Sequence, residues 1–303
     1  MISVVGHTAT DHIFKVPVFP ERHSSVPILD HKIYYGGGAA NIAAGIAKLG
    51  GECELFSAVG FDFSGSEYDL WMDELGIRKN LLCSDDKRTA SCYLYNDEDG
   101  DQITFFEWGA SELFTTADSP RFECVHMATA DPSFNVKVSE NSEFASFDPG
   151  QDLINYSGEQ LSVILDNIDI LFANKHEMKG MAEKIGISEA DIIKSVPVSV
   201  VTMSGDGSVI HMNGSKTRIP SVPVTLADPT GAGDAYRAGF LTAQQIGYDP
   251  VTCCKIGTVA ASFNVESVGP QTNLPDWERM KLRYEEHFGK LEAVIYSAEP
   301  ERR

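Results

Sequence analysis

The sequence predicts an α/β protein in which helices cover a mainly parallel central sheet. Short apolar runs with strand character recur along the chain, and segments with helical spacing separate them, as in parallel sheets. Two segments, 12–35 and 89–107, depart from this alternation and are expected to leave the main sheet. At 303 residues the chain is long enough for one large domain, so we expect a single domain over residues 1–303.

The individual elements follow from local patterns in chain order. The chain passes directly from Met1 into an apolar strand, and later runs have the same character. The strand-like runs are 4–5, 55–56, 125–127, 144–147, 170–172 and 198–201. Helices are expected at 38–49, 66–75, 158–166, 175–185, 234–246, 250–265 and 276–290. The last of these places Trp277, Met280, Tyr284 and Phe288 at helical spacing, which indicates a core face rather than a cofactor site.

The two departing segments have the features of a small separate sheet. Within the second, residues 89–95 and 102–106 are strand-like, and the acidic turn 96–101 joins them as in a hairpin. Strands that leave the main sheet and return are suited to a lid, formed here by segments of about 12–35 and 89–107. A lid excludes water from a reaction that hydrolysis would waste. A simple decoration of the sheet edge is the alternative.

Composition excludes several classes of partner. The net charge is −20, so nucleic acids and anionic membrane surfaces would be repelled, and no apolar run is long enough to span a membrane. The six cysteines show no C-x-x-C spacing, which indicates buried free thiols. With no leader pattern after Met1, these observations predict a cytoplasmic protein that binds neither nucleic acid nor membrane.

The most informative motif is the run of residues 228–234, Asp-Pro-Thr-Gly-Ala-Gly-Asp, which precedes a predicted helix. The amides of Gly231, Ala232 and Gly233 would be unpaired donors of the first helical turn, and such donors attract phosphate oxygens. Asp234 follows the glycine turn, and its carboxylate would accept the proton of a substrate hydroxyl during phosphoryl transfer. The alternative for this motif alone is a helix cap after a flexible turn.

Two motifs near the amino terminus have the character of a site for a hydroxylated substrate. Gly37 and Gly38 belong to a glycine run that follows a strand and opens a helix, and small residues there let a polar ligand approach the backbone. Asn41 offers an amide that donates and accepts, and Asp11, just beyond the first strand, would accept two neighbouring sugar hydroxyls. Close helix packing and a turn aspartate are the alternatives. The third glycine of a dinucleotide fingerprint is absent, because position 41 is asparagine.

Two further motifs follow predicted strands in the carboxyl-terminal half. Asn174 and Glu177 open a helix and are placed to hold Mg²⁺ through its waters, although a helix cap has the same pattern. Thr202, Gly205 and Gly207 form a bend that would receive a nucleotide phosphate or ribose, or would be an ordinary hairpin turn. The motifs of P-loop kinases, zinc metalloproteases and serine hydrolases are missing from the sequence.

In this order, these motifs resemble the ribokinase-like (PfkB-type) carbohydrate kinase family over nearly the whole chain. The resemblance implies a three-layer α/β/α fold with a small β lid, a sugar-like acceptor, ATP and Mg²⁺. It implies that Asp234 is the catalytic base and that Gly231, Ala232 and Gly233 form its anion hole. The expected acceptor contacts are Asp11, Gly37, Gly38 and Asn41; the expected nucleotide contacts are Asn174, Thr202, Gly205 and Gly207; the expected magnesium contact is Glu177, through water.

Within that family the motifs are most similar to those of archaeal nucleoside kinases, notably at 6–9, 34–37, 102–106, 146–152 and 271–275. This similarity implies ATP-dependent phosphorylation of the 5′-hydroxyl of a ribonucleoside. Gln151 is then a candidate to contact a base edge, and Phe105, Phe106 and Trp108 are candidates to stack on the base or to form the lid core. Two departures are Gly38, where alanine is usual in that group, and Pro229, which removes one amide donor from the turn.

Two alternative functions remain open from the sequence. One is a kinase for a free sugar such as fructose, ribose or a keto-deoxy sugar acid, and the other is a regulator that binds a ligand on the same fold without catalysis. Retention of the base with its glycine turn argues against the regulator, because binding alone needs no base. The preferred nucleobase or sugar, the phosphate donor, any monovalent cation and a homodimer formed by paired lids are not decided by the sequence.

Overall fold

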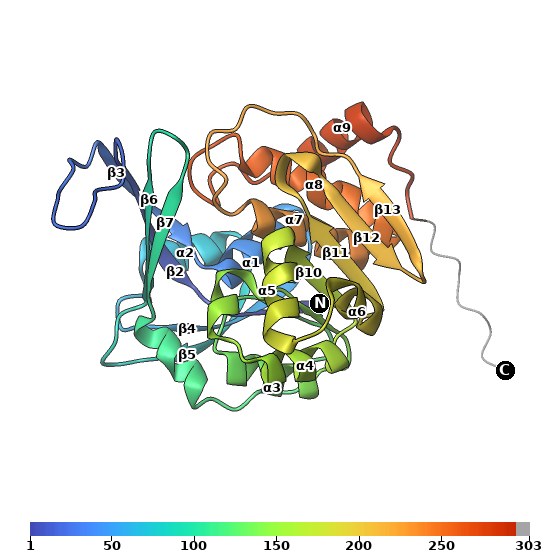
Figure 1. Cartoon of the computed structure of the whole chain (residues 1–303), viewed down its shortest axis with the longest axis horizontal. Helices are drawn as coiled ribbons and strands as arrows, with labels where there is room; N and C mark the ends of the chain where they lie inside the picture. Colours follow the sequence, from blue (N-terminus) through green and yellow to red (C-terminus); the bar gives the residue numbers. More distant parts are fainter. Residues whose placement is uncertain (295–303) are drawn as a thin grey trace.

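The computed structural model describes residues 1–294, which form a nine-stranded sheet between two helical layers and a four-stranded sheet at one end (Figure 1). The large sheet has the strand order β13-β12-β11-β10-β9-β8-β1-β4-β5, and neighbouring strands pair parallel except that β12, near one edge, is antiparallel to both β11 and β13. Its strands are β1 Ile2–Val5, β4 Cys53–Val59, β5 Arg78–Cys83, β8 Val125–Met127, β9 Ala145–Phe147, β10 Ile170–Asn174, β11 Val198–Thr202, β12 Ser208–Met212 and β13 Ser215–Ile219.

Most of the helices begin at side chains that cap their first turns, whereas α1 and α7 begin at Gly37 and Gly231 without such a cap. Ser157 and Gln160 form a reciprocal capping box in α4, and Asp276 accepts the amide of Arg279 at the start of α9. The helices are α1 Gly38–Lys48, α2 Glu67–Glu74, α3 Pro132–Glu140, α4 Gly158–Asn167, α5 Lys175–Ile185, α6 Glu189–Ser195, α7 Ala232–Ile246, α8 Pro250–Asn264 and α9 Trp277–Phe288. Short 3-10 helices lie at Gly109–Thr115, Gly150–Asn155 and Ser204–Asp206.

Apolar residues on the two faces of the large sheet form two separate cores. One core joins the sheet to α1, α2, α7, α8 and α9, and the other joins it to α3, α4, α5 and α6. In the first core α1 and α7 pack closely at Gly45, where a Cβ would lie 2.5 Å from the Cβ of Ala238. This close packing brings the amino-terminal ends of the two helices together.

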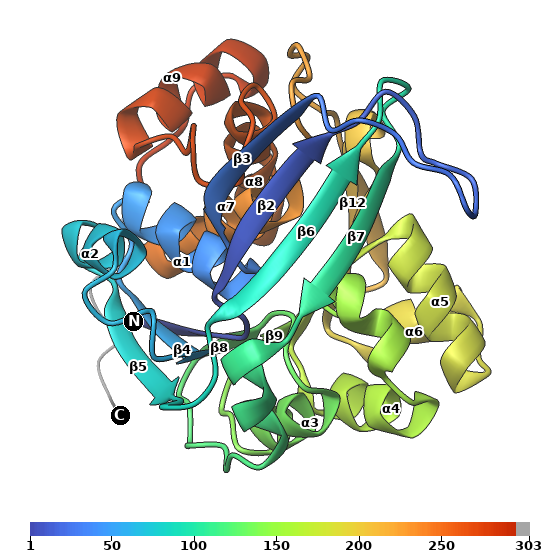
Figure 2. The same cartoon turned by 90° about the vertical axis from the view of Figure 1, so that its left-hand side faces the viewer.

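The smaller sheet consists of β3 Asp30–Gly36, β2 Ala9–Lys15, β6 Ala90–Asn96 and β7 Gln102–Glu107, in that order (Figure 2). β6 and β7 pair antiparallel as a hairpin, whereas β2 and β6 are parallel. The contacts that tie this sheet to the main body include two hydrogen bonds: Gln102 donates to Thr230 Oγ1 at 3.5 Å, and Tyr68 donates to the carbonyl of Gly36 at 2.8 Å. That the sheet acts as a lid stays a prediction.

The predicted fold class is confirmed, and the seven predicted helices are present with ends within about two residues of expectation. Helices α3 and α6 were not predicted, although Asp131 before Pro132 and Ser188 before an acidic turn cap them in the expected way. Strands β5 and β13 were not predicted either; they lie at the two edges of the sheet and carry few buried residues. Across residues 1–294, no helix combines the length and apolar character that crossing a membrane requires.

Candidate active site

The topology of the large sheet marks one place for a ligand. β4 and β5 lie on one side of β1, while β8 and the strands after it lie on the other. The order in which successive strands are placed along the sheet therefore reverses between β1 and β8, which are themselves parallel. In open α/β sheets, ligands bind beyond the carboxyl ends of the strands at such a reversal. Here the segments after β1 and β8 contact each other, because His7 donates its amide to the carbonyl of Thr129 at 2.9 Å.

Asp234 lies at this point, in the first turn of α7. Asn41 in α1 donates to Asp234 Oδ2 at 2.9 Å, although the two residues are 193 positions apart. A Cβ at Gly38 would lie 3.9 Å from Asp234 Oδ1, so the backbone at the start of α1 lies close to this carboxylate. Three predicted site residues from the two halves of the chain therefore meet where α1 and α7 begin.

The glycine turn before α7 is held in place by Asp228, which is buried. Asp228 Oδ1 accepts the amide and the hydroxyl of Thr230, and Oδ2 accepts the amide of Gly269 at 3.0 Å. Gly231 has a φ of 78°, a left-handed conformation that favours glycine. The amide of Ala232 donates to Pro229 at 3.1 Å, so the turn itself uses one of the expected anion donors. The amides of Gly233 and Asp234 follow it in the first helical turn, where a helix offers no acceptor.

Asn41 differs from expectation in its contacts. Its Nδ2 serves Asp234, and its Oδ1 accepts from Gln271 Nε2 at 3.0 Å. Gln271 also donates to the hydroxyl of Tyr68, and its Oε1 accepts from Trp71. Both polar atoms of Asn41 are thus engaged in a buried network that orients Asp234, and a direct contact with an acceptor stays a prediction.

Asp11 is buried on the inner face of the four-stranded sheet, against Gly36. A Cβ at position 36 would overlap its carboxyl group, so only glycine fits there. Burial, together with the neighbouring charges of Asp234 and Asp228, raises the pKa of Asp11 to about 8. Gly37 has a φ of 91°, and a Cβ there would meet the backbone of His7 and Ala9. The local structure therefore requires glycine at position 37, whether or not this residue contacts a ligand.

Sequence reasoning missed two charged residues beside Asp234. Arg237, one helical turn later, places NH1 3.3 Å from Asp234 Oδ1 and NH2 2.6 Å from Asp148 Oδ1. Asp148 directly follows β9, and the sequence analysis noted its motif without giving this residue a role. The i, i+3 spacing of Asp234 and Arg237 was the signal that could have identified the pair.

Asn174 and Glu177 form a reciprocal helix cap at the start of α5. Asn174 Oδ1 accepts the amides of His176 and Glu177, and Glu177 Oε2 accepts the amide of Asn174 at 2.7 Å. Thr202 pairs with Asn174 across β10 and β11, so both lie at the same edge of the sheet. Residues 1–294 contain no group of three or more His, Cys, Asp or Glu side chains arranged to hold a metal. A magnesium contact of Glu177 through water stays a prediction.

Gly205 and Gly207 lie in the turn between β11 and β12. Gly207 has a φ of 86°, and Met203 donates its amide to the carbonyl of Gly207 at 2.8 Å, which closes the turn. Lys175 of α5 pairs with Asp206 at 3.8 Å and links this turn to the start of α5. The four predicted nucleotide residues therefore lie on two adjacent connections, and their contact with a nucleotide stays a prediction.

The aromatic candidates in β7 separate onto different faces. Phe105 pairs with Tyr93, is 61% exposed, and contacts Tyr95 on the outer face of the four-stranded sheet. The interpretation of Phe105 as a stacking residue is wrong, because successive side chains of a strand point to opposite faces. Phe106 packs on the inner side, 4.7 Å from His7 between ring centroids.

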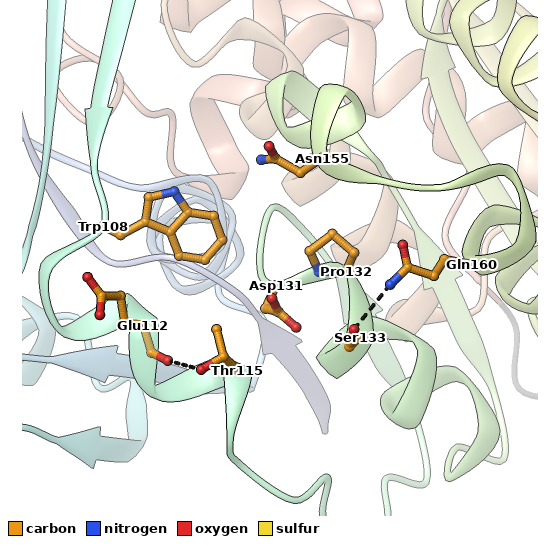
Figure 3. Close-up of a pocket in the computed structure, with 8 residues that line it drawn as sticks. All are labelled: Trp108, Glu112, Thr115, Asp131, Pro132, Ser133, Asn155 and Gln160. Atoms are coloured by element: carbon orange, nitrogen blue, oxygen red, sulfur yellow. Dashed lines mark hydrogen bonds between the residues drawn. The ribbon is translucent and has the colours of Figure 1, made fainter.

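Two hollows border this region. One of about 490 Å³ lies between the inner face of the four-stranded sheet and the loop before α7, and its lining includes Ile13, Tyr34 and Asp228. The other, of about 380 Å³, is drawn in Figure 3. Trp108 lines this second pocket and also contacts His7 edge-on at 5.1 Å. The other residues of its lining are Glu112, Thr115, Asp131, Pro132, Ser133, Asn155 and Gln160.

Gln151 is exposed in the 3-10 helix after β9, next to Asp152. Asp152 in turn contacts His7 Nε2 at 3.1 Å, so this helix adjoins the end of β1. The structure thus brings the neighbour of Gln151 to the site, and contact of Gln151 itself with a nucleobase stays a prediction.

Comparisons with known proteins find relatives over nearly the whole chain. The model of the pfkB family of carbohydrate kinases matches residues 1–277. The chain is 44% identical to a nucleoside kinase of Methanocaldococcus jannaschii, covering 94% of this chain and 97% of the relative. It is 39% identical to a nucleoside kinase of Methanothermobacter thermautotrophicus, covering 94% and 96%.

Solved structures give the same result. The crystal structure of the Methanocaldococcus jannaschii nucleoside kinase, an archaeal member of the ribokinase family, superposes with a TM-score of 0.89 over 94% of this chain and 98% of that one. A nucleoside kinase of Burkholderia thailandensis in complex with inosine has a TM-score of 0.86 at 26% identity, over 96% of this chain and 98% of that one.

Proposed function

The chain belongs to the pfkB family of carbohydrate kinases, and from this premise we propose that it transfers the γ-phosphoryl group of ATP to the 5′-hydroxyl of a ribonucleoside. The observation that carries the proposal is the meeting of Asp234, Asn41 and the Gly38 backbone where α1 and α7 begin. A carboxylate held beside a glycine turn with free amides is what phosphoryl transfer to an alcohol needs. The names of the relatives support a nucleoside as the alcohol.

In this proposal the acceptor lies between the four-stranded sheet and the loop before α7. The hollow of about 490 Å³ borders this space and is lined by Tyr34 and Asp228 but not by Asp11, which lies on the same face of the sheet. The ribose hydroxyls would be bound by Asp11 and the Gly37-Gly38 backbone, which leaves the 5′-hydroxyl beside Asp234. As the O–P bond to the 5′-oxygen forms and the bond to ADP breaks, Asp234 accepts the hydroxyl proton.

Glu177 is a suitable outer contact for magnesium. Its negative charge acts on both Asp148 and Arg237, and its carboxylate has acceptor capacity beyond the one amide that it caps. Oxygen ligands and retained water are what Mg²⁺ prefers. When bound, the ion neutralises charge on the phosphate oxygens of ATP.

Replacing Glu177 by glutamine is expected to raise the magnesium concentration needed for half-maximal activity by roughly tenfold. Glutamine keeps the reciprocal cap of α5 and removes only the charge. The measurement is a magnesium titration at fixed ATP, with Glu278→Gln in the first turn of α9 as the matched control. An unchanged titration curve would remove Glu177 from the magnesium site.

The wild-type rate is expected to fall in acid, with kcat/KM decreasing about tenfold for each pH unit below the pKa of Asp234. Burial raises that pKa to about 6, while Arg237 and the hydrogen bond from Asn41 act to lower it. Below this pH the carboxyl group is protonated and cannot accept the hydroxyl proton. Initial rates at constant ionic strength between about pH 5 and 8 test this expectation, and a flat profile would contradict it.

The experiment that tests the function is release of ADP from Mg-ATP with a panel of nucleosides and free sugars. We expect nucleosides to be accepted, a 5′-deoxynucleoside to be inert, and the product to be the 5′-monophosphate by phosphorus NMR. Acceptance of free sugars alone would establish a sugar kinase instead. Nucleoside binding without ADP release from any acceptor would establish a regulator that does not catalyse.

A further inference from the structure

A single buried guanidinium connects the proposed base to a second carboxylate. Arg237 NH2 lies 2.6 Å from Asp148 Oδ1, its NH1 lies 3.3 Å from Asp234 Oδ1, and the side chains of Arg237 and Asp148 are 11% and 4% exposed. Exposed ion pairs contribute little because water screens them, but this group is largely removed from water. The position of the guanidinium therefore has a strong effect on both carboxylates.

The surrounding backbone holds this arrangement in place. A Cβ at Gly233 would lie 2.8 Å from Arg237 NH1, so glycine at this position lets the guanidinium fold back along the first turn of α7. Asp148 is held in turn by the amide of Gly150, which donates to its Oδ1 at 3.3 Å. Arginine has donors in a planar fork and reaches both carboxylates, which the single ammonium of lysine does less well.

Charges from several elements face this group. The charge of Arg237 lowers the pKa of Asp234 and the charge of Asp148 raises it. The charge of Glu177 raises the pKa of Arg237. Burial and the charge of Glu177 raise the pKa of Asp148 to about 7, although Arg237 acts to lower it. The other titratable groups that face Asp234 or Arg237 are Asp11 in β2, Tyr68 in α2 and His126 in β8. Burial lowers the pKa of His126, which keeps it neutral.

The Nε–H donor of the guanidinium has no acceptor in the part of the chain that the structure describes. Arg237 Nε is buried and has no acceptor there, and His126 Nε2 is buried and likewise has no partner among residues 1–294. The ion pairs that the guanidinium makes within residues 1–294 are those with the two carboxylates. This distribution fits a group that organises Asp234 better than one that stabilises the fold by filling its hydrogen bonds.

We propose that Arg237 is the positioning residue of this site, and that Asp148 is the anchor that holds its guanidinium beside the Asp234 carboxylate; this inference rests on the function proposed above. With Oδ1 held by Arg237 and Oδ2 by Asn41, the carboxylate has a fixed plane. The proton that leaves the acceptor oxygen passes to this carboxylate as the O–P bond forms. Arg237 touches neither reactant in the proposal and acts through Asp234.

The two members of the pair affect the base in opposite directions. Without Arg237, two buried carboxylates of like charge would remain, and protonation of one would be favoured. Without the charge of Asp148, the guanidinium would act on Asp234 alone and favour its ionised form. The direction of the pH change therefore separates an electrostatic role from a loss of packing, which would lower activity at every pH alike.

The test compares the pH dependence of kcat/KM in four variants. In Arg237→Gln we expect the midpoint of the acid limb to rise by about two pH units, so that the rate at pH 7 falls roughly tenfold and recovers in alkali. Asp148→Asn should move the midpoint to lower pH. The double variant should lie between wild type and Arg237→Gln, and Arg237→Lys should be closer to wild type than Arg237→Gln.

Separate control experiments address the activity and the folding of these variants. Arg121→Gln removes an exposed arginine that pairs with Glu143 and should leave the profile unchanged. Thermal unfolding checks that each variant folds, and the double variant removes one charge of each sign, which keeps the net charge of the buried group. The midpoints of all four variants coinciding with wild type, or moving in one common direction, would overturn the inference.

A measurement that does not require enzymatic activity distinguishes this inference from the proposed function. In protein labelled with ¹³C at the aspartate carboxyl carbons, the Asp234 signal is assigned by its loss in Asp234→Asn and titrated in each variant. The same order of midpoints in a protein that releases no ADP with any acceptor would support the inference and overturn the proposed function. An Asp234 midpoint that is unaffected by Arg237→Gln would overturn the inference even in an active kinase.

Discussion

Asparagine at position 234 is expected to lower kcat by roughly 10²–10⁴-fold, the range for removal of a positioned base, while ATP and nucleoside still bind. An amide cannot accept the hydroxyl proton, yet its oxygen still accepts the hydrogen bond from Asn41, which donates at 2.9 Å in the native site. The variant therefore removes the base and preserves the local shape. Steady-state kinetics and calorimetric binding of the nucleoside measure the two effects separately.

The matched control for this substitution is Asp166→Asn, which changes an exposed aspartate at the end of α4. We expect its kinetics to be those of wild type. Full turnover by Asp234→Asn would show that another group accepts the proton, and loss of nucleoside binding as well would show that the substitution disturbs the site beyond its base.

Replacing Gly231 by alanine is expected to lower kcat about 10²-fold, because displacement of the amides by about 1 Å is enough to misalign the reacting groups. The φ of 78° at Gly231 is strained for alanine, and an added Cβ would lie 2.9 Å from Pro270 Cα. Since Pro270 belongs to the backbone that Asp228 ties to the turn through Gly269, the turn itself must move. Rapid-quench measurement of the phosphoryl-transfer step reports the loss directly.

Gly186 supplies the control that separates strain from displacement. It has a φ of 82° at the carboxyl end of α5, and an added Cβ meets nothing within 4 Å. Gly186→Ala should therefore lower the free energy of unfolding by about 1 kcal/mol and leave kcat unchanged. If both alanine variants lose stability equally and neither loses activity, the glycine turn before α7 is not part of the catalytic machinery.

Much of the fold was accessible from local pattern. The alternation of apolar strands with amphipathic helices predicted the parallel sheet, and the turn between Asn96 and Gln102 predicted the hairpin of β6 and β7. The helices that were missed, α3 and α6, have caps that the same rules would have identified. The edge strands β5 and β13 were missed because they carry few buried residues, so apolar runs do not reveal them.

The candidate site was accessible only in part. Asp234 and the glycine turn were identified because the residues that form them lie within seven consecutive positions, 228–234. Arg237 and Asp148 were given no role, since their importance comes from a contact between residues that are far apart in the chain. The error at Phe105 has a similar origin, because the strand faces were assigned only when pairing with Tyr93 fixed the register.

By itself, the sequence determined where helices begin, where glycine permits a left-handed turn, and which carboxylates and amides follow the strands. These properties depend on residues a few positions apart, so a linear pattern contains them. Only the tertiary structure decided that Asn41 orients Asp234 and that Arg237 lies between two buried carboxylates. The ionisation of a buried group depends on every charge within several ångströms and on the loss of water around it, and both are set by the packing of distant segments.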